Sequence, residues 1–264
     1  MKNTRTERLI RIASRFLTFP SKQTSITELS EQFEVSKTIV SEDMGIIDKA
    51  FREEGVGTLK IERGRSGGAS LKPCFTGRER RCFLEKVAAA LSSNDRILPG
   101  MLIHYSDLLF DPSYARPLGY ALASDFADKN PDVVMTSEVK GIPLSIFTAH
   151  ALGVPMAVCR FRNRPGDGPA VAVHYPSGSG DVRTMFMGTR FLPQGKRALI
   201  IDDFMRGGST AAGMLLVAKE FGAPVVVIGV FIAASEPEKK AVSEYRSLLR
   251  LERGPDGTPV VKVR

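Results

Sequence analysis

Residues 198–210, which read ALIIDDFMRGGST, decide how the second half of this chain folds. The apolar run 198–201 is typical of a buried strand, and it ends at two adjacent carboxylates, Asp202 and Asp203. A Gly-Gly-Ser-Thr turn follows, and the apolar segment 211–218 then favours a helix. This order of strand, loop and helix predicts a loop at the carboxyl end of a sheet strand, where backbone N–H groups and the helix N-terminus attract phosphate.

The composition of this loop indicates a phosphorylated sugar as its ligand. The glycine pair 207–208 lets the backbone approach an anion closely, and the hydroxyls of Ser209 and Thr210 can add donors while capping the helix. Two adjacent carboxylates would repel a phosphate, so they serve another group, such as the vicinal hydroxyls of a sugar or a bound cation. The spacing excludes the common nucleotide motifs, because neither G-x-x-x-x-G-K nor G-x-G-x-x-G follows a strand.

Segment 199–210 resembles the signature of the phosphoribosyltransferase family, in which a strand leads into Asp-Asp, a short loop, Gly-Gly and Thr. In that family the signature holds the ribose hydroxyls and the 5′-phosphate of 5-phosphoribosyl-1-pyrophosphate (PRPP). The alternative is a solvated acidic strand end beside an ordinary capped helix. Arg206 departs from the small residues that the family usually carries there. The resemblance implies PRPP contacts by Asp202, Asp203, Phe204, Met205, Arg206, Gly207, Gly208, Ser209 and Thr210.

Length and composition indicate a soluble protein with two domains. The chain has 264 residues and 43% hydrophobic content, which is ample for two cores. No apolar run reaches membrane-spanning length, and residues 1–5 lack a signal-peptide hydrophobic region, so we expect a cytoplasmic protein with no membrane partner. Cys74, Cys82 and Cys159 have no metal-ligand spacing, so we expect neither a metal site nor a disulfide scaffold. The net charge of +8 suits a polyanionic partner.

The first part of the chain has the pattern of a helix-turn-helix. Residues 5–19 predict an amphipathic helix with apolar residues on one face and arginines roughly opposite. Segment 25–33 opens with a capping hydroxyl and stops early, and a second helix begins with Ser36 as its N-cap. Two short helices joined by a tight turn would place the start of the second helix in the major groove of DNA.

A basic hairpin after these helices predicts a wing. Residues 58–63 alternate like a strand, 64–68 form a basic, glycine-rich turn, and 69–72 form the returning strand. The combination predicts a winged helix-turn-helix that binds double-stranded DNA, whereas the alternative is a small helical module for dimerisation or protein interaction. The residues expected to contact DNA are Arg5, Arg8, Arg15, Lys37, Thr38, Ser41, Lys60, Arg63 and Arg65.

Alternating strands and helices in the rest of the chain predict an α/β domain with a mainly parallel sheet flanked by helices. Pro73 and the residues after it mark a boundary that divides the chain into domains 1–74 and 75–264. The expected strands are 132–136, 154–160, 198–201 and 224–232. The expected helices are 78–92, 118–129, 211–218 and 236–249.

Two further segments resemble the phosphoribosyltransferase site. Segment 137–141 is a second loop between a strand and a helix, and it resembles the family's pyrophosphate-binding loop, where Lys or Arg precedes Gly. The alternative is that Lys140 is an ordinary surface lysine. Arg160 ends the next strand, where the adenine and xanthine branch commonly carries Arg-Lys, but Phe161 follows it here. The PRPP contacts expected from these segments are Ser137, Val139, Lys140, Gly141 and Arg160.

Residues 162–184 form a polar, glycine-rich segment with residues 183–187 as its returning strand. The segment suits the mobile flap that closes over the pyrophosphate in this family, and it also suits an ordinary β-hairpin. The flexible loop is expected to include Tyr175, Ser177, Gly178 and Ser179.

A winged helix joined directly to such a domain resembles the purine operon repressor family of Gram-positive bacteria, and this resemblance extends over nearly the whole chain. It implies a homodimer with a type I phosphoribosyltransferase-like domain that binds PRPP as a signal without catalysis. It also implies repression of purine biosynthesis and transport genes, with PRPP counteracting DNA binding. Magnesium as a companion of PRPP, and guanine nucleotides as competitors for the same pocket, are left open.

Two other functions share the same ligand site. One is a catalytically active purine phosphoribosyltransferase with an accessory basic domain. Transfer needs a site for the incoming base, and the residues offer no convincing base pocket. The other is a transcriptional activator or an RNA-binding regulator.

Overall fold

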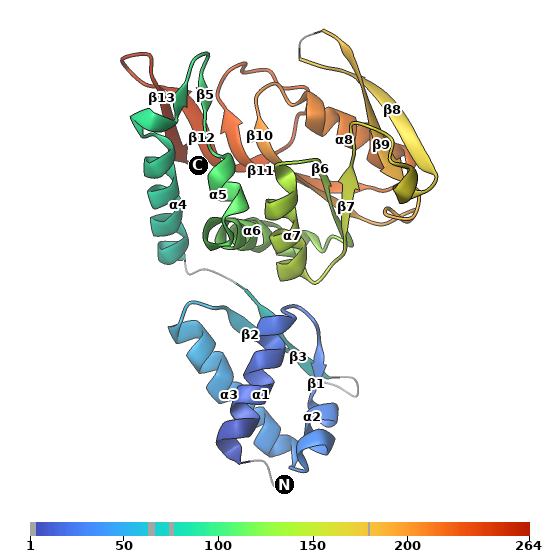
Figure 1. Cartoon of the computed structure of the whole chain (residues 1–264). Coiled ribbons are helices and arrows are strands. Elements are labelled where there is room, and N and C mark those ends of the chain that lie inside the picture. Colours follow the sequence, from blue (N-terminus) through green and yellow to red (C-terminus); the bar gives the residue numbers. More distant parts are fainter. Residues whose placement is uncertain (1–3, 63–66, 74–76, 179) are drawn as a thin grey trace. The chain divides into compact units, whose positions relative to one another are not determined.

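A computed structural model gives the fold of the chain (Figure 1). Its contacts divide the chain into two compact units, Met1–Glu79 with His150–Gly153 and Arg80–Ala149 with Val154–Arg264. The predicted domain boundary between residues 74 and 75 lies outside the described residues. The structure describes residues 4–62, 67–73, 77–178 and 180–264.

The first unit has the predicted winged helix-turn-helix architecture. Its strands form a three-stranded antiparallel sheet in the order β1-β3-β2. Thr4, Ser25 and Ser36 each accept a hydrogen bond from the backbone N–H three residues on, so a hydroxyl caps each of the helices α1, α2 and α3. The elements are α1 (Arg5–Thr18), β1 (Thr24–Ser25), α2 (Ile26–Phe33), α3 (Lys37–Glu53), β2 (Thr58–Glu62) and β3 (Gly68–Lys72).

The apolar faces of these helices form the core of the first unit. Ile12 and Phe16 of α1, Leu29 of α2 and Met44 of α3 are fully buried, and Leu71 of β3 packs with them. Burying each such side chain contributes about 1.5–3 kcal/mol, which offsets the entropy lost when these short helices form.

The second unit is built on a six-stranded sheet in the order β13-β12-β11-β10-β6-β7. Neighbouring strands are parallel, except that β13 runs antiparallel to β12 at one edge, so the predicted mainly parallel sheet is confirmed. The strands are β6 (Val133–Ser137), β7 (Met156–Cys159), β10 (Ala198–Met205), β11 (Val225–Ala234), β12 (Arg246–Arg253) and β13 (Pro259–Val263).

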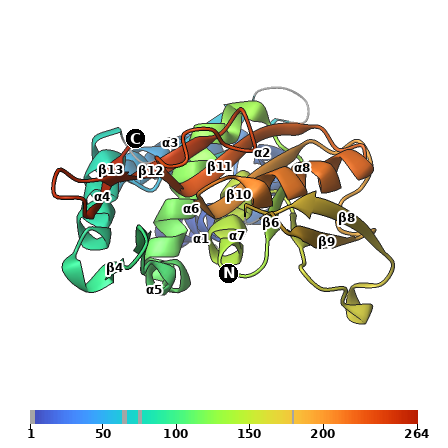
Figure 2. The ribbon, with the colours of Figure 1, turned by 90° about the horizontal axis from the view of Figure 1, so that it is seen from above.

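Helices cover both faces of this sheet, and two small hairpins lie outside it. The hairpin of β8 and β9 lies beside α8 at the β7 end of the sheet (Figure 2), where Arg160 forms a β-bridge with Phe186. The helices are α4 (Gly77–Leu91), α5 (Ser106–Phe110), α6 (Pro112–Phe126), α7 (Gly141–Leu152) and α8 (Ser209–Glu220). The hairpin strands are β4 (Ile97–Leu98), β5 (Leu102–Ile103), β8 (Ala170–Pro176) and β9 (Val182–Gly188).

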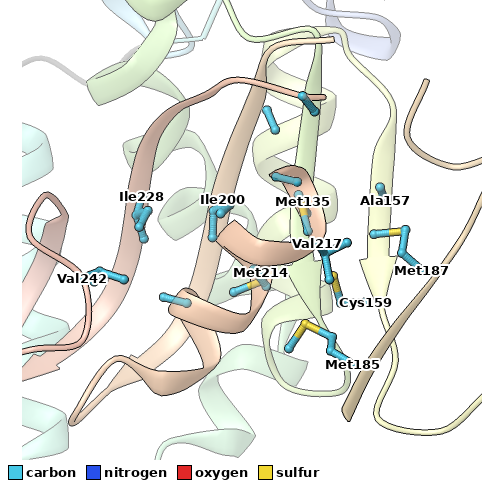
Figure 3. Packing of buried hydrophobic residues seen from close by; sticks show 14 of the residues in the cluster. Met135, Ala157, Cys159, Met185, Met187, Ile200, Met214, Val217, Ile228 and Val242 are labelled. Atoms are coloured by element: carbon cyan, nitrogen blue, oxygen red, sulfur yellow. The ribbon is translucent and has the colours of Figure 1, made fainter. Parts of the chain in front are cut away.

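Alternation along the strands assigns one face of the sheet to α8 and the other to α6. Met214 and Val217 of α8 pack with Ile200 of β10 in the buried cluster of Figure 3. Gly229 of β11 points to the opposite face, where a Cβ atom would lie 2.5 Å from the Phe126 ring of α6. Burial on both faces explains why β10 and β11 consist of nearly continuous apolar runs.

Two predicted helices differ from the structure. The helix predicted over residues 236–249 is wrong, because residues 246–253 form β12, whose backbone pairs with β11 and whose Leu249 and Leu251 enter the core. The apolar spacing there fits a strand as well as a helix, and the free edge of β11 decides between them. The helix predicted over 118–129 begins earlier, at Pro112, because Asp111 caps it by accepting a hydrogen bond from Ser113 N.

No helix in the described part of the chain combines the length and the apolar character needed to cross a membrane.

Candidate functional site

The segment between β10 and α8 has the geometry of an anion-binding turn. Gly208 is the N-cap of α8 and has φ +81°, a left-handed conformation that favours glycine. The predicted capping by Ser209 and Thr210 is wrong, since these residues form the first turn of α8 and Gly208 caps it with no side-chain hydrogen bond. Their partly exposed hydroxyls therefore lie at the positive end of the helix dipole. We call residues 206–208 the glycine loop.

Asp202 and Asp203, the acidic pair, lie at the end of β10 in different environments. Asp202 is only 3% exposed, and Asp203 is partly buried and donates its backbone N–H to Asp202 Oδ1 at 3.1 Å. Burial, together with the negative charge of Asp203, raises the pKa of Asp202 well above its ordinary value. The ionised form of Asp202 is therefore costly in the free protein. Hydrogen bonds from the hydroxyls of a ligand would offset part of that cost.

Tyr105, which the sequence analysis missed, contacts both of the predicted loops. Its hydroxyl donates to Asp203 Oδ2 at 2.6 Å, and its ring stacks on Phe204 with centroids 5.8 Å apart. The Lys140 ammonium lies 4.8 Å from the centre of the same ring. Burial, and then the nearby Asp203 carboxylate, raise the pKa of Tyr105, so its hydroxyl stays protonated as a donor. No sequence pattern could have found this residue, because it precedes Asp203 by 98 positions.

The strands β6 and β10 are parallel neighbours, so the loop between β6 and α7 lies at the same carboxyl end of the sheet as the acidic pair. Ser137 is buried at the end of β6, whereas Val139 is 61% exposed. Gly141 opens α7 where a Cβ atom would lie 2.4 Å from Thr136 Oγ1, so this close approach requires glycine. The structure therefore brings the predicted pyrophosphate loop and the glycine loop together at the carboxyl ends of neighbouring strands, with Lys140 turned towards Tyr105.

Arg160 follows β7 beside this loop, but its guanidinium already has two acidic partners. Its Nε donates to Asp167 Oδ2 at 3.0 Å, and a terminal nitrogen donates to Glu138 Oε2 at 3.4 Å. Hydrogen bonding to Asp167, followed by that to Glu138, raises the pKa of Arg160. A guanidinium carries five N–H donors, so these two bonds leave donors with which Arg160 could also bind a phosphate.

The predicted flexible loop falls into two parts. Tyr175 is 1% exposed and packs on α8, where a Cβ at Gly213 would lie 2.9 Å from its ring, so the assignment of Tyr175 to a flexible loop is wrong. Ser177 and Gly178 belong to the turn between β8 and β9, in which Ser177 N donates to Asp181 O at 2.7 Å. Ser179 lies outside the described residues. The Met205 side chain is buried in the core, so only the backbone of this residue could contact a ligand.

A cavity of about 460 Å³ lies beside the glycine loop, whereas the sequence offered no convincing base pocket. It is lined by Leu98 and Met101 of the β4–β5 hairpin, Ser235 after β11, Thr258 before β13 and Arg206. Arg206 therefore belongs to the glycine loop and also to the wall of this cavity. Among the described residues, no group of three or more His, Cys, Asp or Glu side chains could hold a metal ion.

In the first unit, the start of α3 carries an exposed polar cluster. Lys37, Thr38 and Ser41 are exposed on its first turns, as the prediction of DNA contacts requires. Lys60 of β2 is also exposed and pairs with Glu62 at 2.6 Å. The predicted wing residues Arg63 and Arg65 lie outside the described residues.

The arginines of α1 have partners within the unit. Arg8 is 6% exposed and donates to Asp43 Oδ2 at 2.5 Å, so its placement on a solvated, DNA-facing stripe is wrong. Asp43 is fully buried in α3, and Arg5 also donates to it, at 3.2 Å. Arg15 donates to Gln32 of α2. These contacts join α1 to the two helices that follow it.

Comparison with known proteins agrees with this architecture. The family described as "Bacterial purine repressor, N-terminal" matches residues 4–73, and the family described as "Phosphoribosyl transferase domain" matches residues 117–260. The chain is 38% identical over 252 residues to the purine biosynthesis transcriptional repressor PurR of Bacillus subtilis, covering 95% of this chain and 88% of that protein. The chain belongs to the bacterial purine repressor family.

This purine repressor family member also resembles a protein with a different name. It is 34% identical over 250 residues to the purine biosynthesis transcriptional activator PurR of Lactococcus lactis, covering 94% of this chain and 92% of that one. The adenine phosphoribosyltransferase of Thermoanaerobacter pseudethanolicus matches the fold with a TM-score of 0.54 and 20% identity, covering 63% of this chain and 99% of that chain. The last likeness shows the fold alone.

Proposed function

We propose that this chain is a DNA-binding transcriptional repressor of purine biosynthesis and transport genes, and that PRPP is the effector that relieves DNA binding. One observation carries the proposal. In a member of the purine repressor family, the acidic pair, the glycine loop and Lys140 lie together at the carboxyl ends of the neighbouring strands β6 and β10. A regulator that binds bacterial promoters would act in the cytoplasm, where the chromosome lies.

The chemistry at this end of the sheet suits both parts of PRPP, the ribose 5-phosphate and the pyrophosphate. The ribose hydroxyls would donate to Asp202 and Asp203, and the 5′-phosphate would accept from the N–H groups and hydroxyls of residues 207–210. The pyrophosphate would lie at the β6–α7 loop, where Lys140 supplies positive charge. Magnesium would accompany the pyrophosphate, because this cation binds phosphate oxygens and retains several waters.

The cavity beside Arg206 supports the proposal that guanine nucleotides compete with PRPP for this site. The cavity of about 460 Å³ could take a purine base while the phosphates of the nucleotide occupy the glycine loop. Competition would then arise because both ligands need the same backbone N–H groups.

Control of DNA binding is a coupling between two sites on one chain. Lys37, Thr38 and Ser41 at the start of α3 would enter the major groove, and a homodimer would present two such helices to two half-sites. Coupling free energies are typically about 1–3 kcal/mol and are reciprocal, so operator DNA would weaken PRPP binding by the same factor as PRPP weakens DNA binding.

A promoter gel-shift titration tests this function. Labelled fragments from purine gene promoters should be retarded by the protein and released as PRPP is added. A protein that ignores these fragments, or that binds them equally well with PRPP, contradicts the proposal. Transcription in vitro from the same fragments decides the direction of regulation, since the Lactococcus lactis relative is named an activator.

The competing function is a purine phosphoribosyltransferase, because the second unit has that fold. Incubation of the protein with PRPP, magnesium and each purine base separates the two. We expect no nucleotide at an enzymatic rate, and nucleotide formed at such a rate would favour the enzyme.

A further inference from the structure

The segment between β11 and β12 donates hydrogen bonds to the backbone of the glycine loop. Lys240 Nζ donates to the carbonyl oxygens of Arg206 at 2.5 Å and of Ala234 at 2.8 Å. One residue on, the backbone N–H of Ala241 donates to Gly207 O at 2.7 Å. Two successive carbonyl groups of the glycine loop are therefore held by two successive residues of this segment.

The same segment packs against the N-cap of α8. A Cβ atom on Gly208 would lie 3.4 Å from Ala241 N, 3.5 Å from Val242 Cγ2 and 3.6 Å from Lys240 Cβ. These would be ordinary van der Waals distances for the added atom, so residues 240–242 lie close to Gly208, with room between them for about one methyl group.

The direction of the two carbonyl groups determines where the amides of the glycine loop point. In a trans peptide, the C=O and the following N–H point to opposite sides. Because the oxygens of Arg206 and Gly207 face residues 240–241, the N–H groups of Gly207 and Gly208 face away from them. Neither N–H donates a hydrogen bond to any residue that the structure describes. Both are oriented to receive an anion at the start of α8.

We propose that Lys240 is a positioning residue of the effector site, whose ammonium group orients the amides of the glycine loop towards the 5′-phosphate of the effector. This inference rests on the proposed function, which supplies the phosphate. Lys240 acts through the Arg206 and Ala234 carbonyl groups, so it contributes to affinity without contacting the ligand.

The surroundings of Lys240 show that its two acceptors hold it in place. Burial, with smaller effects from Arg250 and Arg206, lowers the pKa of Lys240. An ammonium group kept near two cations gains its stabilisation from the carbonyl oxygens to which it donates.

Substitution of Lys240 tests the inference in the full-length protein. Lys240→Met keeps the length of the side chain but removes its donors, and Lys240→Arg restores donors. Lys239→Met is the matched control, because Lys239 is the exposed neighbour. Affinity for PRPP, ribose 5-phosphate and pyrophosphate is measured by calorimetry, and the melting temperature is measured for each variant.

We expect Lys240→Met to weaken PRPP and ribose 5-phosphate by a common factor of about 10, as the loss of a charge-assisted hydrogen bond predicts. Pyrophosphate affinity should not change, Lys240→Arg should recover most of the loss, and Lys239→Met should match wild type. If Lys240→Met does not fold, Lys240→Gln, whose side chain is too short for both carbonyl oxygens, undergoes the same measurements.

The results separate the inference from the function on which it rests. Equal binding of ribose 5-phosphate by wild type and Lys240→Met would overturn the role of Lys240 and leave the PRPP sensor intact. An equal loss for all three ligands, together with a lower melting temperature, would also overturn it, because that pattern reports general damage. Wild-type protein that binds no PRPP would refute the proposed function itself.

Discussion

The Tyr105 hydroxyl donates a 2.6 Å hydrogen bond to Asp203 Oδ2, which is one of the oxygens that a ribose hydroxyl would need. The ring that carries this hydroxyl also stacks on Phe204 and lies under the Lys140 ammonium. Asp203 therefore already has one hydrogen-bond donor from within the chain, and a ribose hydroxyl bound to Oδ2 would have to compete with Tyr105 or share this oxygen with it.

Removal of the Tyr105 hydroxyl should strengthen effector binding. In Tyr105→Phe, Asp203 Oδ2 loses its internal donor while the ring and its stacking remain, so PRPP affinity should rise about 3- to 10-fold, as expected for one neutral donor to a carboxylate. Calorimetric titration measures the change, and Tyr114→Phe, a tyrosine of α6 outside this cluster, is the control. Unchanged binding would show that the Tyr105 hydroxyl does not compete with the effector, and weaker binding would show that it supports the bound state.

Loss of the Asp203 charge should separate effector binding from DNA binding. Asp203→Asn should reduce PRPP affinity about 10- to 100-fold, because hydrogen bonds to a charged acceptor contribute about 1.5–3 kcal/mol. Promoter binding without PRPP should not change, so the variant would repress constantly. The gel-shift titration measures both, with Asp128→Asn, an exposed residue of the short turn Ala127–Lys129 after α6, as the control. Normal release of the variant by PRPP would refute the site assignment.

Neutralisation of Asp202 should stabilise the free protein. Its carboxyl pKa is raised above the ordinary value of 3.8, so ionisation opposes folding, and this cost grows as the pH rises above about 4. Asp202→Asn should raise the melting temperature at pH 7, by about 2–4 °C for each kcal/mol gained, and weaken PRPP binding. The difference between the variant and wild type should shrink as the pH falls towards 4 in a calorimetric series. A gap that grows on acidification would contradict this.

The exposed start of α3 should contribute to DNA affinity through charge. Lys37→Ala should weaken promoter binding and lower the slope of log K against log salt by about 0.9 if Lys37 contacts one phosphate. PRPP affinity and melting temperature should match wild type. Fluorescence anisotropy over a range of salt concentrations measures the slope, and an unchanged slope would remove Lys37 from the interface.

Arg8 should behave as a structural residue. In Arg8→Ala the fully buried Asp43 carboxylate keeps Arg5, which is largely exposed, as its one remaining ion-pair partner among the described residues. The first unit should therefore lose about 3 kcal/mol of stability. Denaturant unfolding measures this loss, and Arg11→Ala, on the exposed side of α1, is the comparison. Joint replacement as Arg8→Met with Asp43→Leu should recover much of the stability, whereas loss of DNA binding without destabilisation would indicate a direct DNA contact.

Local sequence determined the elements whose signals are short-range. The Ser36 cap and the apolar spacing after it were enough to predict α3. The apolar run that ends at Asp202 predicted β10, and the Gly-Gly-Ser-Thr turn and the apolar segment after it predicted the loop and α8. These predictions succeeded because capping, turn chemistry and strand burial depend on residues a few positions apart.

Only the tertiary structure decided which partners those residues have. It brought Tyr105 to Asp203 and Asp43 to Arg8. It also made the end of the helix predicted over 236–249 part of strand β12 (Arg246–Arg253), which pairs with β11. Each outcome depends on groups far apart in the chain whose desolvation or backbone pairing outweighs local preference. Periodicity within a segment carries no information about such partners.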